Sequence, residues 1–544
     1  MNDPNMPNPT VPGKDSPARS RRHYPRGGSN SILWISTASL LAVAVLSWML
    51  IPRSPGDVSS AKSKLLLYCA AGMRYPMQEL INEYQEAYDV EISPLYQGSN
   101  TLLAQIDVTK KGDLYLAADD SYIRLAREKG LAAESIPLAL MKPVIVVHKD
   151  NKSIQGLDDL LDPANRVCLG NPEAAAIGKK TRKLLTKSGH WEKLNANVTK
   201  RGVFKPTVNE VAVDVKLKAV QAGIIWDATV GQYPELRQIS CPELDSGEAT
   251  IQICVLKGST NPPAALAFAR FISARDRGLQ TFSKKGFRVL EGDIWQQRPE
   301  ITFFAGSVNR RAIEPVIKRF EEREGVTVNT VYNGCGILTS QMRTLQKNKG
   351  KGFPDSYMAC DVYYLKTVQD LFEEGTHISD TDIVMVVQQG NPKKILQLSD
   401  LKRPGIRIAL GHPEQCTIGI LSRRLLESTN VYETIKQNQN IVTETASSAL
   451  LIPNITTGAA DVVLAYRTDT LAEQSKLDVI PITSDLAKAI QPYSIARSSR
   501  FKRLNERLFD TISLSRKQFE QAGFNWRLDM SSSTPGTPGS TPRP

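Results

Sequence analysis

Histidine is scarce in this chain of 544 residues, which contains only His23, His148, His190, His377 and His412. None of them stands in a triad, a zinc-binding motif or a general-base motif, so the sequence offers no recognisable enzyme site. It also lacks a zinc finger, an RNA-binding aromatic motif and a basic heptad array. Much of the formal net charge of +12 is spread along helical segments, which indicates a solvated surface. We therefore expect a protein that is not an enzyme and binds no nucleic acid.

Uncharged runs long enough to cross a bilayer are also scarce, and the one that stands out covers residues 31–51. Arginines precede it and tryptophans lie near both its ends. The positive-inside rule then keeps the disordered, basic residues 1–30 in the cytoplasm and exports the rest of the chain. A cleaved signal peptide is the alternative, but the small residues 59–61 lie well beyond the run. We predict an uncleaved single-pass anchor, a linker over residues 52–63 and both globular parts on the extracytoplasmic side.

Beyond the linker the chain divides into two similar parts, residues 64–290 and 300–528, followed by a disordered Ser/Thr/Pro tail over residues 529–544. The clearest matches are DLYLAAD from Asp113 with DSYMACD from Asp355, and RVCLGNPEAAAIGKKTRKLL with RIALGHPEQCTIGILSRRLL. Short apolar runs alternate with amphipathic helical patterns, which is typical of parallel α/β sheets. At about 230 residues, each copy is long enough to bury its own core.

The loops that follow the expected strands are the candidate binding sites. Ligands of doubly wound sheets bind at the carboxyl ends of strands, against the N-termini of the following helices. The loops here are rich in small residues, hydroxyls and free amides, which suit an anion without a paired cation. The same set recurs in the same order in both copies: residues 70–74, 97–101, 172–178 and 207–209 with Trp226, and residues 305–309, 333–337, 413–419 and 447–449 with Tyr466.

On these segments both copies resemble the periplasmic molybdate- and tungstate-binding proteins of ABC importers. The resemblance implies a type II periplasmic-binding-protein fold, in which two α/β lobes, crossed twice by the chain, close on a tetrahedral oxyanion. It implies molybdate or tungstate as the ligand, no resident cofactor, and an ABC transporter permease as partner. The predicted fold class is therefore α/β, with two tandem two-lobed domains after one N-terminal transmembrane helix.

The pocket of that family uses two serines, two backbone amides and a tyrosine, and the resemblance carries each to one position in each copy. In the first copy the positions are Gly72, Ser99, Ile177, Val208 and Trp226. In the second copy they are Ser307, Cys335, Ile418, Ser448 and Tyr466. Neither copy keeps the full set of residue types.

Seven cysteines are present, and three of them, Cys335, Cys360 and Cys416, fall in separate loops of the second copy that should face its cleft. Buried cysteine is often only a small apolar residue. One alternative is a soft-metal site made by the three sulfurs, with His412 as a possible fourth ligand. A redox disulfide between two of the three is another.

These observations favour oxyanion binding for ABC-type uptake by closure of two lobes. The alternative is a membrane-tethered sensor or storage protein, whose second domain binds a soft metal or acts in redox chemistry through its cysteines. Two fused copies and a permanent anchor differ from the usual single soluble binding protein, which supports that alternative. An enzyme on the same fold is a third hypothesis, for which the sequence provides no motif.

Overall fold

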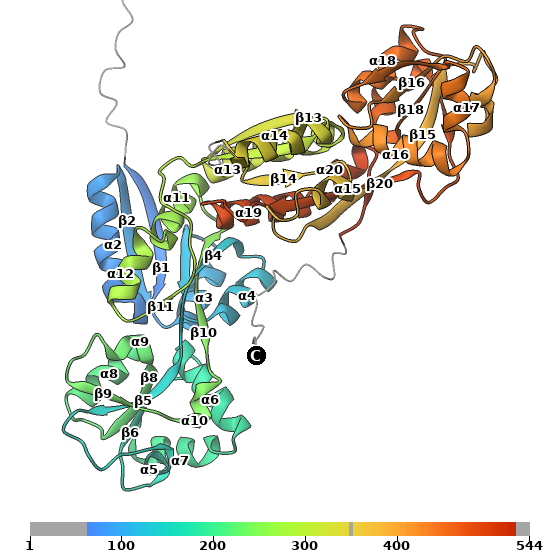
Figure 1. Ribbon diagram of the computed structural model, residues 1–544. Helices are drawn as coiled ribbons and strands as arrows, with labels where there is room; N and C mark the ends of the chain where they lie inside the picture. Colours follow the sequence, from blue (N-terminus) through green and yellow to red (C-terminus); the bar gives the residue numbers. More distant parts are fainter. Residues whose placement is uncertain (1–61, 348–351, 529–544) are drawn as a thin grey trace, which may run out of the picture. The chain divides into compact units, whose positions relative to one another are not determined.

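The computed structural model describes residues 62–347 and 352–528 (Figure 1). The predicted arm, membrane anchor and tail, residues 1–30, 31–51 and 529–544, lie outside the described residues. Most of the predicted linker, residues 52–61, also lies outside them. Its last residue, Ser63, is the first residue of the first strand. Within the described ranges no helix combines the length and the apolar character that crossing a membrane requires.

The first copy builds its first lobe on a mixed sheet with the strand order β11-β4-β10-β3-β1-β2. β1 pairs in parallel with β2 and β3, whereas β10 runs antiparallel to β3 and β4. Along β1, Leu65, Leu67 and Cys69 lie in the core, as the alternation of a strand requires. The strands are β1 (Ser63–Ala70), β2 (Val90–Gln97), β3 (Leu114–Ala117), β4 (Ala132–Met141), β10 (Ala249–Leu256) and β11 (Arg288–Val289). The helical elements are η1 (Ala71–Met73), α2 (Arg74–Ala87), α3 (Ser99–Thr109), α4 (Asp120–Glu128), α11 (Pro262–Ser273) and α12 (Gly278–Lys284).

The second lobe of this copy has a five-stranded sheet in the order β7-β6-β8-β5-β9. The chain enters it from β4 and returns through β10, so it crosses between the lobes twice, as Figure 1 shows. The strands are β5 (Pro143–His148), β6 (Val167–Gly170), β7 (Val203–Lys205), β8 (Ala222–Trp226) and β9 (Leu236–Ile239). The helices are α5 (Leu157–Leu161), α6 (Ala176–Lys187), α7 (Trp191–Arg201), α8 (Val208–Lys216), α9 (Asp227–Val230) and α10 (Pro242–Asp245).

The second copy repeats this plan, but its two sheets are joined into one of ten strands. The join is β15 (Thr376–Gln388), whose first half pairs with β20 and whose second half pairs with β18 and β19. The other strands are β12 (Glu300–Gly306), β13 (Thr327–Asn333), β14 (Ser356–Met358), β16 (Ile408–Gly411), β17 (Ile441–Thr445), β18 (Val462–Tyr466), β19 (Leu477–Pro481), β20 (Lys488–Ile495) and β21 (Asn525–Trp526). The helical elements are η2 (Ser307–Asn309), α13 (Arg310–Glu324), α14 (Cys335–Lys347), α15 (Val362–Lys366), η3 (Leu398–Lys402), α16 (Thr417–Ser428), α17 (Tyr432–Gln437), η4 (Ser448–Leu450), α18 (Leu451–Thr456), η5 (Arg467–Lys476), α19 (Lys502–Ser513) and α20 (Arg516–Gln521).

An aspartate marks the same place in both copies and fixes their correspondence. Asp113 accepts a hydrogen bond from the amide of Leu66 at 2.9 Å, and Asp355 accepts one from Thr302 at 2.9 Å. Each copy also has its own hydrophobic core that runs through both of its lobes. The structure therefore supports the predicted architecture of two tandem α/β domains, each of two lobes.

Candidate ligand-binding pockets

The first copy holds a small pocket at the carboxyl ends of its central strands. Its empty space is about 240 Å³, including the part that is open to solvent, and residues of both lobes line it. The helices α3, α6 and α8 begin at its wall, so their free amides lie close to it. The lining residues are Ala70, Ala71, Gly72, Gln97, Gly98, Ser99, Ala118, Ala175, Ala176, Ile177, Val208 and Trp226.

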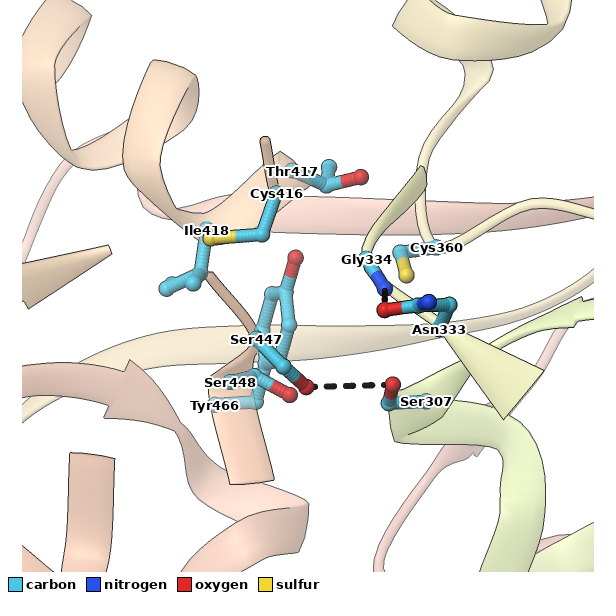
Figure 2. A pocket seen from close by; sticks show the side chains of 10 residues that line it. All are labelled: Ser307, Asn333, Gly334, Cys360, Cys416, Thr417, Ile418, Ser447, Ser448 and Tyr466. Carbon is cyan, nitrogen blue, oxygen red and sulfur yellow. Dashed lines mark hydrogen bonds between the residues drawn. The ribbon is translucent and has the colours of Figure 1, made fainter. Parts of the chain in front are cut away.

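The second copy has its pocket at the equivalent place, shown in Figure 2. Its empty space, including the part that is open to solvent, is about 160 Å³, and its lining is richer in hydroxyl groups than that of the first pocket. The hydroxyl of Ser447 donates to Ser307 at 3.1 Å, which joins the two lobes across the pocket. The lining residues are Ser307, Asn333, Gly334, Cys360, Cys416, Thr417, Ile418, Ser447, Ser448 and Tyr466.

Nine of the ten predicted ligand-binding residues line these pockets. All five of the first copy do: Gly72, Ser99, Ile177, Val208 and Trp226. In the second copy Ser307, Ile418, Ser448 and Tyr466 do. Cys335 is fully buried and does not line the pocket.

One predicted correspondence between the copies is wrong by one residue. Leu66 and Thr302 are equivalent because their amides donate to the matching aspartates, Asp113 and Asp355. The residue equivalent to Ser307 is therefore Ala71 and not Gly72. The helical turns agree, because η1 begins at Ala71 and η2 begins at Ser307. The first copy therefore has a methyl group where the second has a hydroxyl, and Gly72 is a neighbouring wall residue.

Several lining residues were predicted only as members of loops. Gln97, Gly98, Asn333, Gly334, Thr417 and Ser447 belong to this group. Ala118, which directly follows β3, was missed altogether. Its partner in the repeat, Cys360, was noticed because it is a cysteine, and comparison of the two copies would have indicated Ala118.

No charged side chain is among the lining residues of either pocket. In the second pocket the hydroxyl group of Tyr466 is buried and lacks a hydrogen-bond partner among the described residues. Burial raises the pKa of Tyr466 well above its ordinary value, so its phenol keeps its proton and can donate it. Neutral donors at helix N-termini can stabilise an anion without a cation.

The two lobes of the first copy are held together by direct contacts. The amide of Asn100 donates to the carbonyl of Ala174 at 3.1 Å, and its side chain donates to Glu173 at 2.7 Å. Lys180 of the second lobe forms an ion pair of 2.6 Å with the buried Asp119 of the first. Burial opposes the charge of Asp119, but Lys180 and Ser121 outweigh it and lower the pKa of the carboxyl group. The structure therefore represents a closed form of this copy.

The second copy is closed by a different set of groups. The amide of Ile337 donates to Gln415 at 3.3 Å, and the phenol of Tyr364 donates to Pro413 at 3.2 Å. Leu421 stands at the position of Lys180, so this copy has no equivalent ion pair with Asp361. Burial raises the pKa of Asp361, which accepts hydrogen bonds from the amides of Tyr363 and Ile490.

The three cysteines of the second copy do not form the predicted soft-metal site. The Sγ atoms of Cys335 and Cys360 lie 2.9 Å apart, but the thiol of Cys416 donates to the carbonyls of His412 and Thr445. Over residues 62–347 and 352–528, no group of three or more His, Cys, Asp and Glu side chains is placed to hold a metal ion. The thiol of Cys416 does not point to Cys335 and Cys360 because it donates hydrogen bonds to these backbone carbonyls.

The known proteins that resemble this chain each match less than half of it. A protein of Haemophilus influenzae that is named "Putative binding protein" is 25% identical over 226 residues, which are 41% of this chain and 90% of that protein. The molybdate-binding protein ModA of Mycobacterium tuberculosis is 26% identical over 200 residues, 36% of this chain and 71% of that protein. The solved structure of the periplasmic molybdate-binding protein of Azotobacter vinelandii is 16% identical, covers 42% of this chain and 100% of its own, and has a TM-score of 0.37.

The family assignment rests on two separate matches. Residues 65–288 and residues 301–525 each match the family described as bacterial extracellular solute-binding protein. Together they span more than half of the chain. The chain therefore belongs to the bacterial extracellular solute-binding proteins and carries two tandem copies of their domain.

Proposed function

We propose that each copy binds one tetrahedral oxyanion of the molybdate, tungstate or sulfate kind by closing its two lobes, and delivers it to an ABC-type permease. The observation that carries the proposal is the composition of the pockets, which offer hydroxyls and helix N-termini but no charged side chain. Such a set of donors suits a small dianion and gives no group for acid–base catalysis. The named molybdate-binding relatives support the same class of ligand, and we propose that the protein is a receptor rather than an enzyme.

The second pocket provides the sharpest test of this proposal. Replacing Tyr466 by phenylalanine removes only a buried hydroxyl that has no partner within the described residues. A hydrogen bond to a charged group is worth about 1.5–3 kcal/mol. We therefore expect the dissociation constant of the second copy to rise by roughly tenfold to a hundredfold. Isothermal titration of the full chain with molybdate, tungstate, sulfate and phosphate would measure it, with two sites expected in the unmodified protein.

Tyr432 is the matched control for this variant. Its ring packs against Arg423 in the second lobe, and it does not line the pocket. Tyr432→Phe should leave both sites unchanged, and the first copy serves as an internal reference in every titration. Failure of all four anions to bind the unmodified chain, or full affinity in Tyr466→Phe, would refute oxyanion binding by this pocket.

We also propose that both copies act on the extracytoplasmic side, tethered by residues 31–51. This rests on the uncharged run and the arginines before it. Deleting residues 31–51 should move the protein from the membrane fraction to the soluble fraction, and added protease should reach both copies in spheroplasts of the unmodified strain. Protection of the copies from protease would contradict this orientation.

A further inference from the structure

A pair of thiols that oxyanion binding does not explain lies at the edge of the second pocket. Cys335 is the first residue of α14, and Cys360 follows β14. Their Sγ atoms lie 2.9 Å apart, and the amide of Cys360 donates to the Sγ of Cys335 at 3.1 Å. Cys360 lines the pocket (Figure 2), while Cys335 lies beside it in the core. One thiol of the pair therefore belongs to the wall of the pocket, and the contact is not an isolated core contact.

The first copy has the same local structure without sulfur. Its equivalents are Ser99 and Ala118, where the amide of Ala118 donates to the hydroxyl of Ser99 at 3.2 Å. The two copies also differ at a third position nearby, where the first copy has Ala70 and the second has Gly306. A methyl group on Gly306 would overlap the Sγ of Cys360 and lie 2.8 Å from that of Cys335. The glycine thus leaves space for both sulfurs, and the three positions form one structural unit.

The distance between the sulfurs favours a disulfide over a shared metal ion. Zinc–sulfur bonds of about 2.3 Å at a tetrahedral angle place two sulfurs about 3.8 Å apart. The observed pair is already closer than that. A disulfide of about 2.05 Å needs an approach of less than about 1 Å. We propose that Cys335 and Cys360 are a reversible dithiol–disulfide pair, and that its oxidation state sets the anion affinity of the second pocket.

The oxidation balances with a low-molecular-weight disulfide as the oxidant. The thiolate of Cys360, which lines the pocket, attacks one sulfur of the oxidant and forms a mixed disulfide, while the first leaving thiolate takes up the proton of Cys360. The thiolate of Cys335 then attacks the Sγ of Cys360, and the second leaving thiolate takes up the proton of Cys335. The protein loses two electrons and two protons, and the oxidant becomes two thiols.

The two thiols differ in acidity. Burial opposes ionisation of Cys335, but hydrogen bonds with Cys360, Thr417 and Tyr357 outweigh it and lower the pKa of the Cys335 thiol. Burial and the neighbouring Cys335 raise the pKa of the Cys360 thiol, which makes its attack on the oxidant the slower of the two steps. Cys335 is therefore the readier nucleophile for the second step. Forming the disulfide draws the Sγ of Cys360, which lines the pocket, toward Cys335 and removes both thiol protons, so the wall that faces the anion changes. We expect the anion affinities of the two oxidation states to differ by roughly tenfold. This second part rests on the proposed oxyanion binding.

The test is to reduce the full chain and then equilibrate it with oxidised glutathione. Titration should show the loss of two of the seven thiols, and peptide mass spectrometry should find Cys335 joined to Cys360. The control is the double variant Cys335→Ser, Cys360→Ala, which installs the residues that the first copy uses and should lose no thiols. A second control, Cys416→Ala, installs the equivalent of Ala175 and should still form the disulfide. Isothermal titration with molybdate and sulfate then compares both oxidation states, with the first copy as reference.

The outcomes separate the two proposals. An unchanged thiol count, or a cross-link that uses Cys416, would overturn the dithiol–disulfide pair. A disulfide with equal anion affinity in both states would overturn its control of the pocket. A disulfide in a chain that binds no anion in either state would support the modification site and overturn the oxyanion function.

Discussion

Replacing Gly98 by alanine is expected to raise the dissociation constant of the first copy for its ligand by about a hundredfold, a loss of about 2.7 kcal/mol. A methyl group at this position would overlap the carbonyl oxygen of Ala174 and lie 2.7 Å from that of Pro206. Both oxygens belong to the backbone of the other lobe, so neither can turn aside as a side chain can. The lobes must stop short of closure, and the ligand loses the donors of the second lobe.

This effect should be separable from folding. Gly98 has φ −67° and ψ 146°, which alanine adopts without strain, so the open form of the variant is unaffected. Gly334→Ala should act in the same way on the second copy, because a methyl group there would overlap the carbonyl of Ala446 and lie 2.5 Å from that of Gln415. In each variant the other copy serves as the reference.

Gly156 provides the matched control for the glycine variants. It has an extended backbone, and no atom lies within 4 Å of an added methyl group. Gly156→Ala should bind as the unmodified chain does. Isothermal titration measures the affinities, and small-angle scattering with and without ligand shows whether the variant closes. Ordinary affinity in Gly98→Ala would mean that the closed contact in the structure is not the binding form.

Replacing Glu324 by glutamine is expected to lower the free energy of unfolding by about 3–5 kcal/mol. The carboxylate is 1% exposed and accepts hydrogen bonds from Arg507 at 2.6 and 3.1 Å and from Arg270 at 3.0 Å. Both arginines are buried as well. Glutamine keeps the shape of the side chain but leaves two buried guanidinium groups without their counter-charge, and that imbalance is the source of the cost.

Denaturant unfolding followed by circular dichroism would measure this loss. Glu322 is the control because it lies on the exposed side of the same helix, so Glu322→Gln should change stability by less than about 0.5 kcal/mol. Burial opposes the charge of Glu324, but the two arginines outweigh it and lower its pKa. Its contribution is therefore present above the ordinary glutamate pKa of 4.5 and is lost as the pH falls below that value. A loss below about 1 kcal/mol in Glu324→Gln would show that the arginines find other partners.

The internal repeat made most of the fold predictable. Because the same order of strands, loops and helices occurs twice, each weak local pattern is supported by a second copy of itself. The predicted loops therefore include most of the lining residues of both pockets. The exact alignment of the two copies at the first loop was not predictable, because small residues surround both Ala71 and Ser307 and the sequence alone does not define which of them correspond. The hydrogen bonds of Asp113 and Asp355 fix it.

The sequence did not predict which cysteine sulfurs lie close to each other. Their positions in three loops indicated that they approach one cleft, which is correct for Cys360 and Cys416. Which sulfurs meet depends on the direction of each Cα–Cβ bond and on nearby backbone acceptors, and neither can be read from spacing. The carbonyls of His412 and Thr445 accept hydrogen bonds from the thiol of Cys416. Of the three cysteines, only Cys335 and Cys360 therefore form a pair.

The number of domains, the α/β class and the loops that line the pockets could be predicted from the amino-acid sequence, because apolar periodicity and helix-start signals are local properties of the chain. The closure of the lobes could not, because it depends on contacts such as Lys180 with Asp119 and Gly98 with Ala174. The pairing of the thiols depends on the tertiary structure in the same way. Such contacts join residues far apart in the sequence across distances of a few ångströms, and their geometry is set by packing of the whole domain rather than by any short segment.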